Sequence, residues 1–532
     1  MSLVSFEFIL FLIIGCIIFY ILPKKIQWIC LLALSMFFYL MGGWKTVGFI
    51  LFTALTTWGG ALLIQRVSED TKKKISNSGA EITREQKKLI KAQAKRKKQV
   101  YFWGTLVINF GILAYLKYIN FILENINAAF SLAEDSLIKG IPDLILPLGI
   151  SFYTFQSMGY LIDVYWGKAE ADKNPFKFLL FVSFFPQVLQ GPIGRHGQLA
   201  AQLYQGHKFD LTRFERGLLL MMWGYFKKLA IANRTALIVN SIFDNPTEYG
   251  GAMALLGAFF FALQQYADFS GGIDVVTGAA ELFDIHLMEN FRRPYFSRSL
   301  SEFWRRWHIS LGAWMRDYVF YPFAVTKAMG KFGSFVKKHM GKTMGKVAPV
   351  AIGNILVFLL VGIWHGPYWH YVFWGLYNGV IIAVSAMLEP VFTQMKEKFH
   401  INVKAKWYIG FSIIRTFMIV TFGGFFDRSE KIGSAFYMLK QVFSRFQFGE
   451  INMGTIMAFG LSKQDYIVLA LAFVVLFGVE IYQEIKGASI RDAVFKRSLP
   501  LRWGILYAFL LFAIAAIASA SATAGEFMYA QF

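Results

Sequence analysis

The sequence predicts an all-α integral membrane protein, and three observations support that fold class. Of the 532 residues, 56% are hydrophobic and 16% are charged, whereas an ordinary soluble domain carries roughly 25% charged residues. Long apolar windows recur along the chain, and strongly basic stretches lie between them. Because a spanning helix needs about 20 apolar residues, the windows predict roughly 11 to 13 membrane helices. We expect residues 1–532 to form a single polytopic membrane domain.

The expected membrane segments begin with the window from Phe6 to Leu22. No basic stretch precedes this window and no small-residue cleavage site follows it, so we expect it to remain as the first span. Further apolar windows lie near residues 26–41, 47–65, 100–116, 145–162, 177–193, 217–232, 252–267, 348–364, 368–388, 406–426, 465–485 and 502–521. Proline and glycine interrupt the windows 145–162 and 177–193, which predicts kinked or re-entrant helices there. The interrupting residues are Pro147, Gly149, Pro186, Gly191 and Pro192.

Basic stretches predict the orientation of the chain in the bilayer. The net charge is +21, with 12 Lys/Arg in the loop 66–98 and six lysines in the loop 327–346. Such clusters beside apolar segments are typical of cytoplasmic loops. This orientation places the N-terminus outside the cytoplasm and directs the window 348–364 away from it. The positive charge indicates that the lipid bilayer is a partner. Because no nucleic-acid-binding motif accompanies this charge, we expect no nucleic acid as a partner.

A histidine ends one of the apolar windows. His365 follows Val350–Trp364 and precedes Gly366-Pro367. Proline disfavours helical geometry in the residue before it, so a helix should end here. A titratable ring in an apolar segment costs about 1–3 kcal/mol unless it is hydrogen-bonded. The position suits proton transfer, but a histidine that caps helix carbonyls fits the residues equally well.

A second histidine lies in a predicted interfacial helix at 300–320. Ser299-Leu300-Ser301-Glu302 fits a capping box, so the helix should begin near Leu300. Helical spacing places one apolar and aromatic stripe on this helix, formed by Trp304, Trp307, His308, Leu311 and Met315. His308 should therefore point inward, where it is either a packed structural residue or a functional one.

Several kinds of chemistry find no support in the sequence. No His or Cys pair has the spacing of metal ligands with a carboxylate nearby, so we expect no metal. The chain has no GxSxG elbow, P-loop or GxGxxG motif. We therefore expect no bound cofactor and none of the corresponding hydrolase or nucleotide chemistry.

Ordered motifs resemble the membrane-bound O-acyltransferase (MBOAT) family over nearly the whole chain. The similar strings are Leu146–Gln156, Phe184–Gln187 with Gly191–Ile193, Asp268–Gly271, Glu289–Tyr295, Phe303–Leu311 and Trp364–Gly366. The ending Glu526–Phe532 resembles the aromatic tail of the alginate O-acetyltransferase branch. The chain departs from the pattern at Gln190 and at Phe425–Arg428.

The resemblance implies an MBOAT-type fold around a central catalytic funnel and an enzyme that transfers acyl groups. His365 matches the family's catalytic histidine and His308 its second polar position. We expect His365 to act as the base for a hydroxyl nucleophile, and His308 to position a substrate or stabilise the oxyanion. The acyl group, acetyl, would come from a cytoplasmic thioester, either acetyl-CoA or an acyl carrier, as co-substrate.

The same resemblance suggests an acceptor, partners and a location. The acceptor would be a hydroxyl of an exported cell-envelope polysaccharide, and the chain would lie in the cytoplasmic membrane of a bacterium. An extracytoplasmic acetyltransferase or polysaccharide-modifying protein and an acyl carrier protein are the expected partners. Tyr529 in the tail is a candidate acyl relay, although an aromatic anchor at the membrane interface explains it as well.

Two alternative functions remain open from the sequence. D-alanyl transfer to teichoic acid uses a related enzyme type, but those proteins are usually shorter. A transporter or flippase of lipid-linked sugar would need no proton-transfer histidine, and transporters usually show internal repeats, which this sequence lacks.

Overall fold

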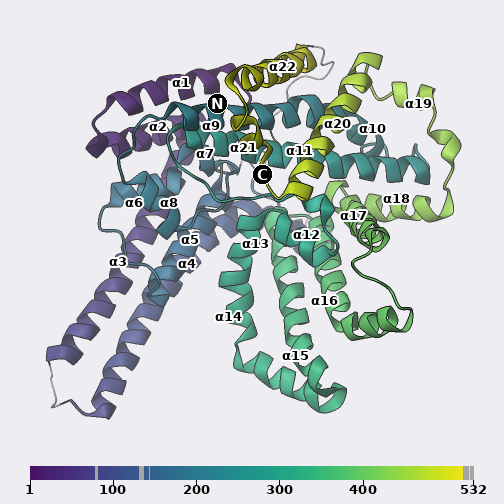
Figure 1. The fold of residues 1–532 in the computed structure, drawn as a ribbon. Helices are drawn as coiled ribbons and strands as arrows, with labels where there is room; N and C mark the ends of the chain where they lie inside the picture. Colours follow the sequence, from purple (N-terminus) through teal and green to yellow (C-terminus); the bar gives the residue numbers. More distant parts are fainter. Residues whose placement is uncertain (78–81, 131–136, 143, 519–526, 528–532) are drawn as a thin grey trace. The chain divides into compact units, whose positions relative to one another are not determined.

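The computed structural model describes residues 1–77, 82–130, 137–142, 144–518 and 527. Every regular element in these residues is helical, which confirms the all-α prediction (Figure 1). The chain divides into two compact units. The first comprises Met1–Glu215 and Ala279–Met288, and the second comprises Arg216–Gly278 and Glu289–Phe532. The sequence-based prediction of one domain over residues 1–532 stays a prediction.

The first unit contains two long helices in a hairpin. Helices α3 and α4 lie side by side (Figure 1), and the predicted basic loop 66–98 is largely helical because it forms their ends. Thr83 starts α4 with a capping box to Gln86. The helices of this unit are α1 (Phe6–Ile21), η1 (Lys24–Ile26), α2 (Gln27–Met41), η2 (Trp44–Thr46), α3 (Val47–Asn77), α4 (Arg84–Ala129), α5 (Ile150–Trp166), α6 (Pro175–Ser183), α7 (Phe185–Val188) and α8 (His196–Leu203).

The predicted interruption at 177–193 is confirmed. Helix α6 ends at Ser183, and the four-residue α7 begins at Phe185 with Pro186 in its first turn. Proline has no backbone N–H and cannot continue the preceding helix. Neither helix is long enough to span a bilayer.

The second unit carries the candidate site. Helix α9 (Leu211–Phe226) begins in the first unit and continues into the second at Arg216. Helix α11 (Gly251–Leu282) belongs to the second unit up to Gly278, and its last residues belong to the first. The other helices of the second unit are η5 (Lys227–Ala232), α10 (Asn233–Phe243), η6 (Pro294–Phe296), α12 (Leu300–Arg306), α13 (Ile309–Met315), η7 (Arg316–Phe320), α14 (Tyr321–Ala324), α15 (Lys327–His365, with a break at Gly341), α16 (Trp369–Lys398), α17 (Lys406–Arg428), α18 (Ile432–Ser444), η8 (Phe448–Glu450), α19 (Met453–Met457), α20 (Lys463–Lys486), α21 (Ile490–Phe495) and α22 (Leu499–Ala518).

Seven helices in the described residues are long and apolar enough to cross a membrane. They lie at 24–41, 44–77, 84–129, 327–365, 369–398, 406–428 and 463–486, and two shorter apolar helices lie at 6–21 and 499–515. The larger number expected from the sequence also counted short, broken or less apolar helices such as α6 and α11. The protein is a multi-pass membrane protein.

The helix predicted over 300–320 is not continuous. Helix α12 begins at Leu300, as expected, and the Ser299 side chain accepts a hydrogen bond from the Glu302 amide. However, the helix stops at Arg306, and a new helix begins at Ile309. His308 between them has a left-handed backbone, with φ of 44°. Contacts of its side chain and of the neighbouring backbone, described below, outweigh the local helical pattern.

Candidate active site

His365 is the last residue of α15, where the sequence predicted the helix to end. Helices α15 and α16 form a tight hairpin (Figure 1). A Cβ atom on Gly362 would lie 2.4 Å from the Tyr371 carbonyl oxygen, and one on Gly375 would lie 2.3 Å from that of Phe358. Only glycine allows the two backbones to approach this closely. The hairpin therefore fixes the position of His365, whose exposed fraction is 7%.

The imidazole of His365 packs in an aromatic setting. Its centroid lies 4.6 Å from the Trp374 ring, 5.2 Å from Trp364 and 5.8 Å from Tyr371. These rings restrict the rotation of the imidazole and keep bulk water away from it. A base held in such surroundings acts on a proton brought to it by a bound substrate.

His365 lines a small chamber. Its volume is about 20 Å³, which is room for roughly one water molecule. The Trp304 indole donates a hydrogen bond of 3.1 Å to Asn378 Oδ1 in its wall. The other lining residues are Phe261, Ala262, Gln265, Phe303, Trp307, Trp374, Val420, Gly423, Gly424 and Asp427.

His308 is positioned by the preceding segment 289–293. The Ile309 amide donates to the Asn290 carbonyl at 3.0 Å, and the Arg292 amide donates to the Arg306 carbonyl at 2.8 Å. These two backbone bonds hold the break between α12 and α13 against segment 289–293. Because the left-handed backbone of His308 is costly for a non-glycine residue, this pairing is what stabilises it.

The tautomer of His308 follows from its contacts. Asn290 Oδ1 accepts hydrogen bonds from the Ser310 amide at 3.0 Å and from the Ser310 hydroxyl at 2.8 Å. An amide N–H can only donate, so the Asn290 atom that faces it must be the oxygen. His308 Nδ1 lies 3.2 Å from this oxygen and therefore carries the proton. Nε2 of the neutral ring is consequently a hydrogen-bond acceptor.

Burial also keeps His308 neutral. Its exposed fraction is 3%, and burial lowers the pKa of His308 from its ordinary value of 6.5 to about 3. A neutral imidazole with the proton on Nδ1 accepts a proton or a hydrogen bond at Nε2. The arrangement therefore favours a positioning role over donation to an oxyanion from that nitrogen.

The structure brings the two sequence-predicted histidines to one tryptophan. The Trp364 ring centroid lies 5.2 Å from that of His365 and 6.0 Å from that of His308. Among the described residues, the chamber lining includes His365 and Trp307 but not His308. The two imidazoles thus share a neighbour while only His365 faces the chamber.

Asp427 and Gln265 are chamber residues that the sequence analysis did not single out. Gln265 Nε2 donates to Asp427 Oδ2 at 2.5 Å, and both side chains line the chamber with His365. Asp427 was noted only as part of a departure from the family pattern. The sequence does contain a signal for Asp427, because a carboxylate directly after the apolar window 406–426 costs free energy in a membrane, as a histidine does.

The motif Asp268–Gly271 supports the site through one buried ion pair and one hydrogen bond. Lys228 Nζ lies 2.6 Å from Asp268 Oδ1, and Lys227 Nζ donates to the Ser270 hydroxyl at 2.8 Å. Phe269 between them contacts the His308 ring edge-on, with centroids 4.9 Å apart. The charged groups thus anchor α11 and η5 to each other, and the aromatic residue packs against His308.

Tyr529, the candidate relay, lies outside the described residues. Phe527 in the same tail is described and buried, with an exposed fraction of 1%. Its ring centroid lies 5.1 Å from Lys228 Nζ, which is a cation–π distance. Phe527 therefore contacts the core at the Lys228–Asp268 pair.

Comparisons with known proteins agree with the motif resemblance. The model of the membrane-bound O-acyltransferase family matches residues 169–337. A probable alginate O-acetylase AlgI of Pseudomonas syringae is 34% identical over 76% of this chain and 72% of its own. A peptidoglycan O-acetyltransferase of Helicobacter pylori is 30% identical over 66% of each chain. A teichoic acid D-alanyltransferase of Bacillus subtilis is 29% identical over 53% of this chain and 68% of its own.

Proposed function

Since the chain belongs to the membrane-bound O-acyltransferase family and is an O-acyltransferase, we propose that it acetylates a hydroxyl of an exported cell-envelope polysaccharide. The donor is a thioester made in the cytoplasm, either acetyl-CoA or an acyl carrier. The observation that carries the proposal is His365, a buried imidazole that faces a small aromatic chamber at the end of a membrane helix.

His365 is the general base in this proposal. A hydroxyl is a weak nucleophile at neutral pH and needs a base near its proton. The ordinary pKa of an imidazole, about 6.5, suits that task. His365 takes the proton as the hydroxyl oxygen attacks the thioester carbonyl, and the proton then passes to the departing thiolate. The aromatic walls exclude water, which would otherwise compete as the acceptor.

His308 has a positioning role in this proposal. Its Nδ1–H is committed to Asn290, so Nε2 accepts from a donor on a substrate or from an intervening residue. We therefore choose positioning over oxyanion stabilisation, the other role expected for it from the sequence.

Localisation and partners extend the proposal. The relatives come from bacteria, and we propose the bacterial cytoplasmic membrane as the location. A carrier of the acyl group and an extracytoplasmic polysaccharide-modifying protein are the proposed partners. Tyr529 stays a candidate relay, supported by the contact of nearby Phe527 with the core.

Chemical analysis of the cell envelope tests the proposed function. The polysaccharide fraction of a strain with the gene is expected to carry ester-linked acetyl groups that a deletion strain lacks, and complementation restores them. D-alanyl transfer is the second candidate, because D-alanyltransferases are among the relatives. Loss of D-alanyl esters from teichoic acid with unchanged acetyl esters would overturn the acetylation proposal in favour of that reaction. Unchanged esters of both kinds would contradict both.

The stability of the protein should depend on pH through His308. Its folded-state pKa lies below the ordinary value of 6.5, so the folded state binds fewer protons than the unfolded state. Its contribution to stability is complete above about pH 6.5 and is lost as the pH falls, by at most about 1.4 kcal/mol per pH unit. The measurement is the melting temperature of the purified protein across this range.

His308→Asn is the matched variant for the pH measurement. Asparagine tolerates a left-handed backbone and does not titrate. Below about pH 6.5, the melting temperature of the wild type should fall more steeply than that of the variant. Parallel curves for the two proteins would contradict the assignment.

Asp427→Asn is expected to lower acyl transfer about tenfold, because it changes the partner of Gln265 in the chamber wall and a hydrogen bond contributes roughly 0.5–1.5 kcal/mol. The substitution keeps the size of the side chain but removes the carboxyl group from the chamber. The matched control is Asp244→Asn, because Asp244 pairs with Arg428, the neighbour of Asp427, at a more exposed position. Equal activity of both variants would show that the carboxyl group of Asp427 does not contribute to acyl transfer.

A further inference from the structure

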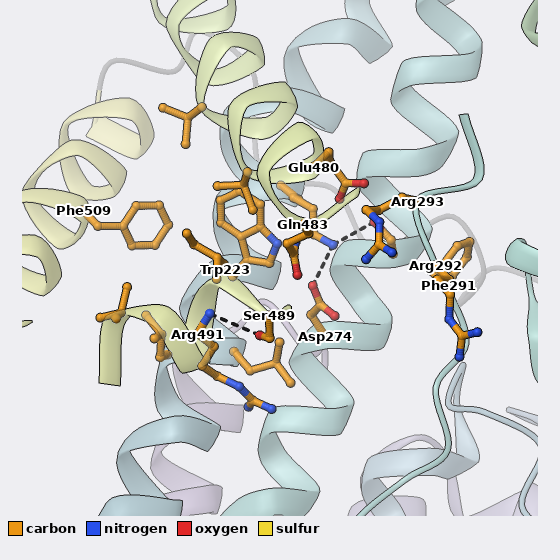
Figure 2. A pocket seen from close by; sticks show the side chains of 18 of the residues that line it. Trp223, Asp274, Phe291, Arg292, Arg293, Glu480, Gln483, Ser489, Arg491 and Phe509 are labelled. Atoms are coloured by element: carbon orange, nitrogen blue, oxygen red, sulfur yellow. Dashed lines mark hydrogen bonds and ion pairs between the residues drawn. The ribbon is translucent and has the colours of Figure 1, made fainter. Parts of the chain in front are cut away.

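A second, larger cavity lies in the same unit as the candidate site. Its volume is about 320 Å³, within the range of cavities that bind small molecules. Helices α9, α11, α20, α21 and α22 and the segment 289–293 line it (Figure 2). In the described residues its lining includes neither His365 nor His308. The proposed acyl transfer therefore leaves this cavity unexplained.

The cavity has an apolar wall and a polar wall. Figure 2 shows Phe509 and Trp223 on one side, and Asp274, Glu480 and Arg293 toward the other. Aliphatic side chains extend the apolar wall, namely Leu219, Val475, Val479 and Ile505. Aromatic and aliphatic groups of this kind fit an alkyl chain, whereas the opposite wall fits a charged head group. The lining as a whole matches an amphiphile.

Most charges of the polar wall are balanced by ion pairs within the protein. Lys227 Nζ lies 2.7 Å from Asp274 Oδ2, and Arg293 Nε lies 2.7 Å from Glu484 Oε2. These pairs hold the wall together and need no ligand for charge balance.

Glu480 differs from the other charged groups of this wall. Its exposed fraction is 7%, and its carboxylate accepts a hydrogen bond of 2.8 Å from the Tyr266 hydroxyl. Within the described part of the chain, Lys227 and Arg293 act on it electrostatically but pair directly with other carboxylates, and no ion pair within 4.0 Å joins a cation to Glu480. A buried carboxylate is stable when a cation or several donors surround it. The cavity therefore calls for a ligand that carries a cationic hydrogen-bond donor.

We propose that this cavity binds a membrane phospholipid with a primary ammonium head group. The ammonium donates to Glu480, and an acyl chain lies along the wall of Trp223, Val479 and Phe509. Arg491 and Ser489 lie on the cavity wall as well and suit the phosphate of such a lipid (Figure 2). The bilayer supplies the ligand, and the proposal does not depend on the identity of the acyl acceptor.

A comparison of two lipids tests the proposal on the unmodified protein. Phosphatidylethanolamine has a primary ammonium with three N–H donors, whereas the quaternary ammonium of phosphatidylcholine has the same charge and no N–H donor. Full-length protein in detergent is titrated with each lipid, and retention is measured by native mass spectrometry. Phosphatidylethanolamine is expected to bind about tenfold more tightly, because a charge-assisted hydrogen bond is made only by that lipid.

Two variants locate the binding. Glu480→Gln removes the charge and should abolish the preference between the lipids. Val479→Phe fills the apolar part without changing charge and should weaken binding of both. The matched control is Glu389→Gln on α16, an exposed carboxylate paired with Lys396, which should bind like the wild type.

Several results would overturn the proposal. Equal binding of the two lipids to the wild type would do so, even if Glu480→Gln did not fold. An unchanged preference in a folded Glu480→Gln protein would also contradict it. Displacement of the lipid by acetyl-CoA would assign the cavity to the thioester donor instead. Loss of lipid preference with normal envelope acetylation would leave the proposed function intact, so the two proposals can fail separately.

Discussion

His365→Ala is expected to lower acyl transfer by about 10²–10⁴-fold, the usual contribution of a general base. The alanine variant keeps the end of α15 but removes the imidazole from the chamber. The measurement is the amount of ester-linked acyl groups on the envelope polysaccharide, normalised to the amount of the protein in the membrane.

His339→Ala is the matched control for this prediction. His339 lies in the part of α15 that precedes its break at Gly341, and its side chain is exposed. Removal of this imidazole should leave acyl transfer unchanged. Full transfer by His365→Ala at a normal protein level would remove His365 from the mechanism, whereas equal loss in both variants would point to a general effect on the protein.

Asp465→Ala is expected to destabilise the protein by roughly 3–5 kcal/mol, the cost of leaving a buried charge without its partner. The side chains of Arg234 and Asp465 are both fully buried, and Arg234 Nε lies 3.0 Å from Asp465 Oδ1. Asp465 also accepts from the backbone and hydroxyl of Ser462 at the start of α20. The substitution thus removes a counter-charge and a helix cap together. Thermal unfolding in detergent and the protein level in membranes measure the effect.

The combination Arg234→Met with Asp465→Leu separates these contributions. Apolar replacement of both partners leaves no buried charge and should recover much of the lost stability. Asp492→Ala is the control, since Asp492 pairs with Arg216 at a partly exposed position and should have little effect. If the double variant were no more stable than Asp465→Ala, the buried charge would not be the main cause.

Local signals predicted several boundaries of this fold correctly. The Ser299 cap placed the start of α12, and Gly366-Pro367 placed the end of α15 at His365. Pro186 marked the break between α6 and α7. Each of these depends on residues within about one helical turn, so the sequence around the boundary contains the necessary information.

Other features depend on residues that are distant in the sequence. The helical pattern over 300–320 predicted one helix, yet backbone bonds to Asn290 and Arg292 break it at His308. Asp427 faces the His365 chamber only because α17 packs against α16. The residues next to His308 and Asp427 in the sequence do not indicate which distant residues these two side chains contact. The ordered family motifs indicated both histidines, but they did not indicate the tautomer of His308 or the carboxylate in the chamber.

The carboxylate of Glu484 links the two motif segments around His308. It lies 2.7 Å from Arg293 and 3.0 Å from Arg306, which belong to the segment 289–293 and to α12. A chain shortened before α20 would leave Arg293 without this counter-charge and Arg306 with Glu302 as its remaining partner, so one of the contacts that join the two segments would be lost. Helix α20 therefore contributes to the surroundings of His308, and a minimal engineered enzyme should retain it.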